Sequence, residues 1–152
     1  MLPKLLERAG SFEGEGSITG LYTTLVEGDD MNDPIGDSVR SIVDGHIVLS
    51  RSLAQRGHFP AIDVLQSASR VMKAVAKPEQ IQLAQKVRET LAVYKEAEDL
   101  INIGAYKAGS NPRIDRAIKI IDAVNDFLKQ AVEDPSDMQM TLRRMQQIYG
   151  GL

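Results

Sequence analysis

The spacing of hydrophobic positions divides the chain into two regions of different character. From residue 78 onward, apolar residues recur every three or four positions, in three stripes separated by Gly104 with the run 109–112 and by the run 134–136. This spacing is that of one face of an α-helix, so it predicts three amphipathic helices. Helices joined by short connections are expected to pack antiparallel around a shared core.

Residues 1–73 instead alternate short apolar runs with loops rich in Gly, Asp and Pro. The runs 17–26 and 46–50 are rich in β-branched residues and predict strands, the first of them covered on both faces. Between them, Asp33 is expected to cap a short helix over 34–43 that begins with a proline. This strand–helix–strand order is typical of a parallel α/β sheet.

The N-terminal region holds too few elements for an independent sheet, because two strands with one exposed edge each are only marginally stable. A further short helix over 51–56 is closed by Gly57. The first residues resemble the last turns of a helix that stops at Gly10. Both observations lead us to expect a fragment whose remaining strands lie upstream.

Composition narrows the possible functions. Of the 152 residues, 43% are hydrophobic and 26% are charged, which supports a packed core. The net charge of −3 offers no basic field for nucleic acid. The absence of cysteine excludes disulfides, thiolate metal sites and cysteine nucleophiles. No stretch has the length of a membrane span or the pattern of a secretory signal, so we expect a soluble, cytoplasmic chain that is peripheral to a membrane at most.

Several short segments, taken together and in order, resemble one family, the flagellum-specific type III export ATPases. These proteins are related to the catalytic subunits of rotary ATP synthases. Six segments in sequence make a specific signal, although each one alone would be weak. The run 101–110 resembles the flagellar branch more than the injectisome branch. The segments are 16–19, 26–34, 40–51, 60–65, 69–72 and 100–106.

The resemblance implies a fold that joins an α/β part to an all-α part. Residues 1–76 would hold the C-terminal strands of a RecA-like P-loop ATPase core, and residues 77–152 would form a three-helix C-terminal domain. The sequence contains no G-x-x-x-x-G-K-[ST] loop, and the acidic strand that handles magnesium is also missing. ATP and Mg²⁺ are therefore expected to bind the complete protein, while this chain alone is expected to bind neither tightly and to be inactive.

The resemblance assigns two site residues. Arg70 matches the arginine that reaches across a subunit interface to the γ-phosphate of a neighbour, acting as a finger in trans. Phe59 matches the aromatic residue that stacks on adenine within its own subunit. The structural alternatives are a surface arginine paired with a carboxylate and a phenylalanine that fills a seam between helix and sheet.

The remaining polar residues suggest less. Glu27, Asp29 and Asp30 follow a predicted strand end, where α/β sheets place ligands, but a solvated or helix-capping loop explains them equally well. The two histidines, His46 and His58, lack metal-ligand spacing, so no metal site is expected.

Two classes of function follow. As part of an enzyme, the chain belongs to an ATPase that energises flagellar type III protein export, supplying a trans arginine finger and a helical docking domain. As an interaction module, it binds partners and hydrolyses nothing. An injectisome ATPase or a rotary ATP synthase subunit is a further alternative. The partners that the family implies are a homo-hexamer, the export stalk and regulators, the export gate and substrate–chaperone complexes, at the cytoplasmic face of the export apparatus.

Overall fold

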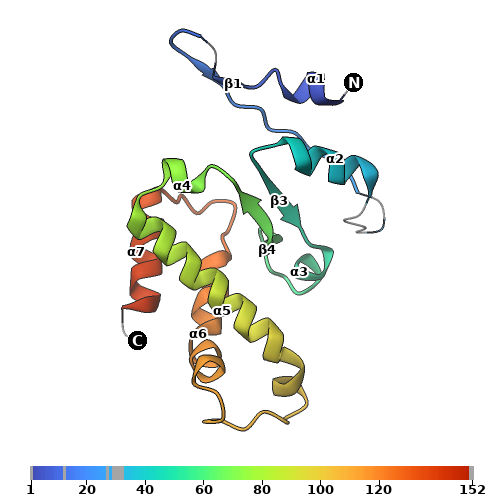
Figure 1. The fold of residues 1–152 in the computed structure, drawn as a ribbon. Coiled ribbons are helices and arrows are strands. Elements are labelled where there is room, and N and C mark those ends of the chain that lie inside the picture. The colour runs from blue at the N-terminus through green and yellow to red at the C-terminus, as the bar shows by residue number, and fades with distance from the viewer. Residues whose placement is uncertain (1, 12, 27, 29–32, 151–152) are drawn as a thin grey trace. The chain divides into compact units, whose positions relative to one another are not determined.

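The computed structural model describes residues 2–11, 13–26, 28 and 33–150. It forms two compact units, residues 1–46 and 47–152, which we describe separately (Figure 1). No described helix is both long and apolar enough to cross a membrane. In chain order the elements are α1 (Leu2–Leu6), β1 (Gly10–Ser11), β2 (Ser17–Ile18), α2 (Pro34–Ile42), β3 (Gly45–Leu49), α3 (Arg51–Gln55), β4 (Ile62–Ser69), α4 (Met72–Val75), α5 (Pro78–Asn102), α6 (Pro112–Leu128) and α7 (Met138–Tyr149).

The first unit contains much less strand than its apolar pattern predicts. β2 pairs antiparallel with β1, and residues 19–26 have no regular secondary structure, so the predicted strand 17–26 is wrong beyond Ile18. A strand that is apolar on both faces needs sheet neighbours and covering layers. In this unit Leu21 and Leu25 are 94% and 92% exposed, so neither requirement is met.

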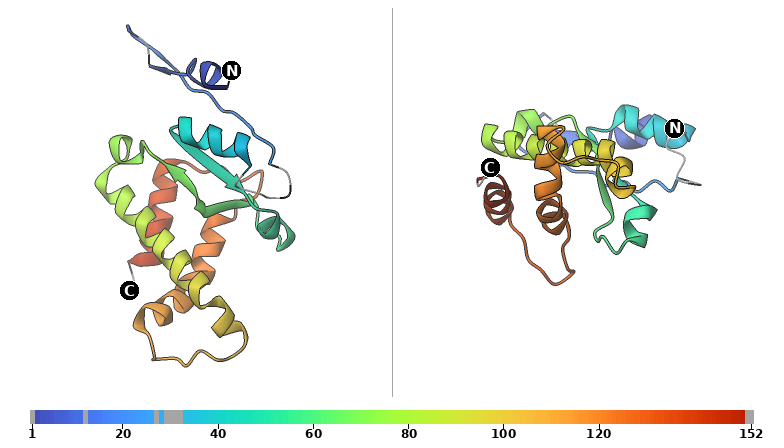
Figure 2. Two further views of the ribbon diagram at one scale, coloured as in Figure 1. Left: turned by 45° about the vertical axis from the view of Figure 1, so that its right-hand side comes forward. Right: turned by 90° about the horizontal axis from the view of Figure 1, so that it is seen from below.

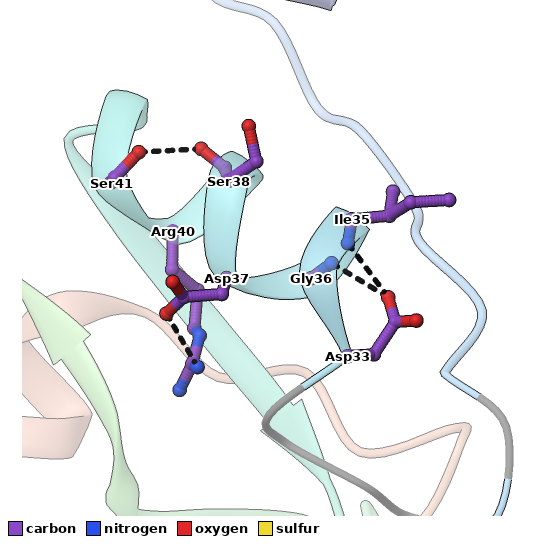
Figure 3. A network of polar contacts seen from close by, with 7 residues as sticks. All are labelled: Asp33, Ile35, Gly36, Asp37, Ser38, Arg40 and Ser41. Atoms are coloured by element: carbon purple, nitrogen blue, oxygen red, sulfur yellow. Dashed lines mark hydrogen bonds and ion pairs between the residues drawn. The ribbon is translucent and has the colours of Figure 1, made fainter.

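Helix α2, which follows residues 19–26 along the chain, forms as predicted. The Asp33 carboxylate accepts hydrogen bonds from the backbone N–H groups of Ile35, at 3.0 Å, and Gly36, at 2.9 Å (Figure 3). This cap satisfies two donors that an α-helix leaves without partners at its start. One turn later, Arg40 forms an exposed ion pair with Asp37 at 3.1 Å. α2 therefore begins where the local sequence dictates and ends one residue before the predicted boundary.

The second unit opens with β3 and α3, both of which confirm the prediction. Ser50 joins them: its Oγ accepts a hydrogen bond from Leu53 N at 3.4 Å, and its own N–H donates to Ala61 O at 2.8 Å. β3 pairs with β4, a strand that the sequence pattern does not predict. The expected parallel sheet of 17–26 with 46–50 is not formed among the described residues, whose strands make two separate pairs.

The three predicted C-terminal helices are confirmed as α5, α6 and α7, which pack against one another (Figures 1 and 2). Their buried centre combines Leu83 and Val87 of α5, Val124 of α6 and Met145 of α7. Val124 has no exposed surface. Partly buried side chains surround this cluster, namely Leu91, Phe127, Leu128, Leu142, Ile148 and Tyr149. The predicted boundary between residues 76 and 77 stays a prediction.

One carboxylate organises the loop between α5 and α6. Asp115 accepts a hydrogen bond from Tyr106 Oη at 2.9 Å and from the N–H of Gly109 at 3.0 Å. Gly109 has φ +87°, a left-handed conformation that glycine adopts without a steric penalty. Asn111 then caps α6 through its side-chain oxygen, which lies 2.9 Å from Arg113 N. The connection between these two helices is thus held by specific polar contacts.

We expect Val124→Ala to lower the free energy of unfolding by about 2 kcal/mol, because it removes two buried methyl groups and leaves a cavity. Val132→Ala is the matched control, since Val132 is 97% exposed and the same change there should cost less than about 0.5 kcal/mol. Urea unfolding of the 152-residue chain measures both. Equal destabilisation by the two variants would contradict the position of the core.

Candidate functional site

The two candidate site residues flank the same strand. Phe59 lies three residues before β4, and Arg70 follows β4 directly. They are therefore at opposite ends of the strand, and a single copy of the chain does not bring them together in one pocket. Different contacts hold the two residues in place.

Phe59 lies in a turn whose backbone is fixed on both sides. Before it, His58 N donates to Leu53 O at 3.0 Å, and Gly57 adopts a φ of +71°. On the other side, Gln130 N, just beyond α6, donates to Phe59 O at 2.9 Å. Phe59 is 56% exposed, which is more than expected of a residue that fills a seam between helix and sheet. A well-held backbone with an exposed flat ring is suited to stacking on a planar ligand.

His58, beside it, is oriented the other way. Its side chain is buried, with 8% of the residue exposed. Burial lowers the pKa of His58 below 6.5, and the positive charge of Lys129 lowers that pKa further. The ring is therefore neutral at pH 7, and its position is that of a buried packing residue.

Arg70 is exposed, immediately after Ser69 at the end of β4. The strand before it is shaped by Asp63, whose Oδ1 accepts hydrogen bonds from Leu65 N at 2.9 Å and Gln66 N at 3.0 Å. Burial raises the pKa of Asp63, but the hydrogen bonds from Gln66 and Leu65 and the charge of Lys95 together outweigh it and leave that pKa lowered overall. Asp63 is therefore an ionised acceptor for the backbone of β4.

Arg88 of α5 is a third residue at this site. The sequence does not predict its role, because a helical arginine outside the apolar stripe is usually solvated. Its Nη2 donates to Leu65 O at 3.1 Å and its Nη1 to Ser67 O at 3.0 Å. Nη1 also donates to Val64 O. Arg88 thus ties the long helix of the C-terminal region to the strand that precedes Arg70.

A cavity of about 190 Å³ lies among α3, β4, α5 and α6. Its lining includes both charge signs, with Arg56 and Lys95 opposed by Asp63 and Glu98. Arg56 and Glu98 form an ion pair at 3.4 Å that joins the end of α3 to α5. Because these charges compensate one another, the cavity has no single-sign character that would select an anion or a cation.

The other polar residues considered in the sequence analysis, the acidic loop and the two histidines, do not extend the candidate site. Glu27, Asp29 and Asp30 lie outside the described residues. Among the residues that the structure describes, no three His, Cys, Asp or Glu side chains come together as a metal site. His46 lies in β3, and His58 lies in the loop between α3 and β4.

Comparison with known protein families divides the chain into two parts. Residues 1–69 match the model of the ATP synthase alpha/beta family, nucleotide-binding domain. Residues 76–147 match the model of the T3SS EscN ATPase C-terminal domain. The first match includes β4 and the turn that carries Phe59, and the second includes α5. Arg70 lies in the short gap between them, residues 70–75.

Two curated relatives are similar along the whole chain. The flagellum-specific ATP synthase of Bacillus subtilis is 49% identical over 150 residues, which is 99% of this chain and 34% of that protein. The type 3 secretion system ATPase of Pseudomonas syringae pv. syringae is 49% identical over 152 residues, with 100% and 34% covered. The chain spans about a third of the length of these relatives.

Two solved structures share the fold. The assembled ATPase EscN from the enteropathogenic E. coli type III secretion system superimposes with a TM-score of 0.92 and 49% identity, covering 97% of this chain and 35% of that one. EscN in complex with its central stalk EscO matches with a TM-score of 0.86 and 46% identity, with 97% and 34% covered. These matches confirm the fold class expected from the sequence.

The position of His58 gives a pH-dependent expectation. Its pKa is below 6.5 in the folded chain, so the unfolded chain binds more protons between that lowered value and 6.5. The free energy of unfolding should therefore fall as the pH drops through this window and level off below it. NMR titration of the histidine ring, assigned with His58→Gln, measures the pKa directly. A value at or above 6.5 would contradict the burial of this ring.

Proposed function

The chain belongs to the family of flagellum-specific and type III secretion ATPases, and on that premise we propose that it is the C-terminal third of an ATPase that drives protein export. The observation that carries the proposal is that about half of the residues are identical to those relatives across the whole chain. The similarity runs through both the nucleotide-binding part and the helical part, which a shared fold alone would not require.

Within that function, Arg70 acts as an arginine finger on the nucleotide of a neighbouring subunit. A guanidinium has five N–H donors in a fixed plane, which suits the charge that spreads over the oxygens of a transferring phosphoryl group. Two observations support this role. Arg70 is exposed directly after β4, and Asp63 and Arg88 fix the backbone of β4 itself. Because its backbone is already fixed, an arginine at this position can extend toward a neighbouring subunit at a smaller cost in backbone conformational entropy.

Phe59 supplies a stacking surface for the adenine of the chain's own nucleotide. Its exposed ring and its backbone contact with Gln130 support this role. Phe59 and Arg70 lie at opposite ends of β4, as expected if they serve two different nucleotides, one in their own subunit and one in the next. This arrangement makes turnover depend on assembly of several copies.

ATP and Mg²⁺ fit this chain only in part. Phe59 offers a place for the base, but the sequence has no G-x-x-x-x-G-K-[ST] loop for the phosphates. The described residues also contain no carboxylate cluster for a metal ion. When bound, ATP supplies the transferred phosphoryl group, and Mg²⁺ neutralises its charge. We therefore assign phosphate and metal binding to the complete protein, and we expect the 152-residue chain alone to be inactive.

The partners of the complete protein are inferred from its similarity to EscN. The EscN structures are of an assembled ATPase and of its complex with the central stalk EscO. We propose a homo-oligomer, a hexamer in the complete protein, and a stalk protein as partner. Regulators, the export gate and substrate–chaperone complexes are proposed as further partners, at the cytoplasmic face of the export apparatus.

The second candidate function, a non-catalytic interaction module, is favoured by one observation. Beside the α5–α6 loop that Asp115 orders, Leu100 and Ile103 remain 48% and 74% exposed. The two functions differ in a simple measurement, phosphate release from Mg-ATP by the complete protein. Release that depends on residues of this chain supports the catalytic function, whereas release unaffected by them leaves only the interaction module.

In the complete protein, Arg70→Ala should lower kcat by ~10³-fold, because it removes a donor that acts on the transition state, and should leave nucleotide affinity nearly unchanged. Steady-state phosphate release and equilibrium binding of a fluorescent nucleotide measure the two effects. Arg116→Ala, an exposed arginine of α6, is the control and should keep full activity. Turnover of Arg70→Ala near that of the unchanged protein would remove Arg70 from the mechanism.

Phe59→Ala should weaken ATP binding by roughly tenfold, since the loss of one base–aromatic stack costs on the order of 1–3 kcal/mol. Phe59→Tyr keeps the ring and should bind ATP as the unchanged protein does. Competition between ATP and inorganic triphosphate separates base from phosphate recognition, and only ATP binding should respond to Phe59→Ala. An equal loss for both ligands would show that the turn, rather than the stack, is disturbed.

A further inference from the structure

Arg88 makes an unusual set of contacts for a residue on the outer side of a helix. Its guanidinium donates hydrogen bonds to the backbone carbonyls of Val64, Leu65 and Ser67, all in β4. In a regular strand, successive carbonyls point to opposite edges. Here the neighbouring carbonyls of Val64 and Leu65 meet the same side chain, so β4 departs from regular geometry where Arg88 binds it.

The other polar groups of this stretch are also engaged by side chains. Asp63 takes the N–H groups of Leu65 and Gln66, at 2.9 and 3.0 Å. Ser67 Oγ accepts from Val48 N at 3.0 Å, which links it to β3. The path of β4 is therefore determined by a carboxylate on one side and by a guanidinium from α5 on the other.

Arg88 contacts backbone carbonyls and not a carboxylate of the described residues. In the part of the chain that the structure describes, it forms no ion pair. The adjacent Glu89 is engaged by Arg113 at 3.2 Å. A planar fork with several donors can hold separate carbonyls at once, which the single ammonium of lysine reproduces poorly. Nη1 and Nη2 of Arg88 are thus both bound to the backbone of β4.

We propose that Arg88 is a positioning residue for Arg70, which couples the location of helix α5 to the placement of the arginine finger. The proposal rests on the catalytic role of Arg70 proposed above. Ser67, the last carbonyl that Arg88 binds, lies three residues before Arg70. A displacement of ~1 Å at a catalytic group can cost on the order of 10²-fold in rate, so a loosened β4 has a measurable effect.

The test is a double-mutant cycle in the complete protein. Arg88→Ala should lower kcat for ATP hydrolysis by roughly 10- to 10²-fold, with KM for ATP changed less than about threefold. In a background that already carries Arg70→Ala, adding Arg88→Ala should lower kcat no further. Arg88→Lys keeps the charge and should give an intermediate kcat.

A matched control separates positioning from general stability. Arg113→Ala removes an exposed α6 arginine that is paired with Glu89 on α5 and does not contact β4, and it should leave kcat unchanged. Hydrogen exchange of the 152-residue chain gives an independent readout. Arg88→Ala should speed exchange in β4 by about tenfold or more and leave α6 protected.

The outcomes distinguish the two proposals. If Arg70→Ala keeps full kcat, the proposed finger role of Arg70 is wrong. The positioning role of Arg88 is then wrong too, even if the hydrogen-exchange rate of β4 changes. A slow Arg70→Ala variant with an unchanged Arg88→Ala variant overturns the positioning role alone. Equal slowing by Arg88→Ala with and without Arg70 shows that Arg88 acts through another route, as does loss of protection in α6.

Discussion

The packing of α5 is the constraint on which residues 47–152 depend. This helix of 25 residues contacts α4, α6, α7 and β4. Leu83 and Val87 on its inner side join Val124 and Met145 in the buried cluster. Because burial of apolar surface is the main favourable term in folding, this seam stabilises the arrangement and also fixes where the polar side of α5 can reach. The contact of Arg88 with β4 is a consequence of that placement.

β4 shows how side chains can replace a sheet in holding a strand. Its pairing within the described residues is with β3, and much of its remaining hydrogen bonding goes to Asp63 and Arg88. Charge-assisted hydrogen bonds are stronger than those between neutral groups. These hydrogen bonds allow an irregular strand to end at a defined residue, Ser69, and Arg70 follows it directly. The order near the candidate finger thus comes from Asp63 within β4 and from the tertiary contact with Arg88 of α5.

The helices could be predicted from the sequence, whereas the strands could be predicted only in part. Helical periodicity and the cap at Asp33 are local signals, and the structure confirms both. The run around Leu21 and Leu25 fails as a strand because its burial depends on covering layers that the described residues do not provide. β4 and the role of Arg88 have no local signal, since carbonyls and guanidinium are more than 20 residues apart. Phe59 and Arg70 were identified through the family resemblance, and their roles stay predictions.

The hydrogen bond from Gln130 to Phe59 has a mechanical consequence. It attaches the C-terminal end of α6 to the turn that presents the aromatic ring, while the opposite end of α6 adjoins the loop that Asp115 orders. A helix of 17 residues is about 25 Å long. With one end as pivot, a tilt of ~5° moves the other end by roughly 2 Å. Any tilt of α6 about its Phe59 end would therefore displace the far loop by more than it displaces the stacking surface.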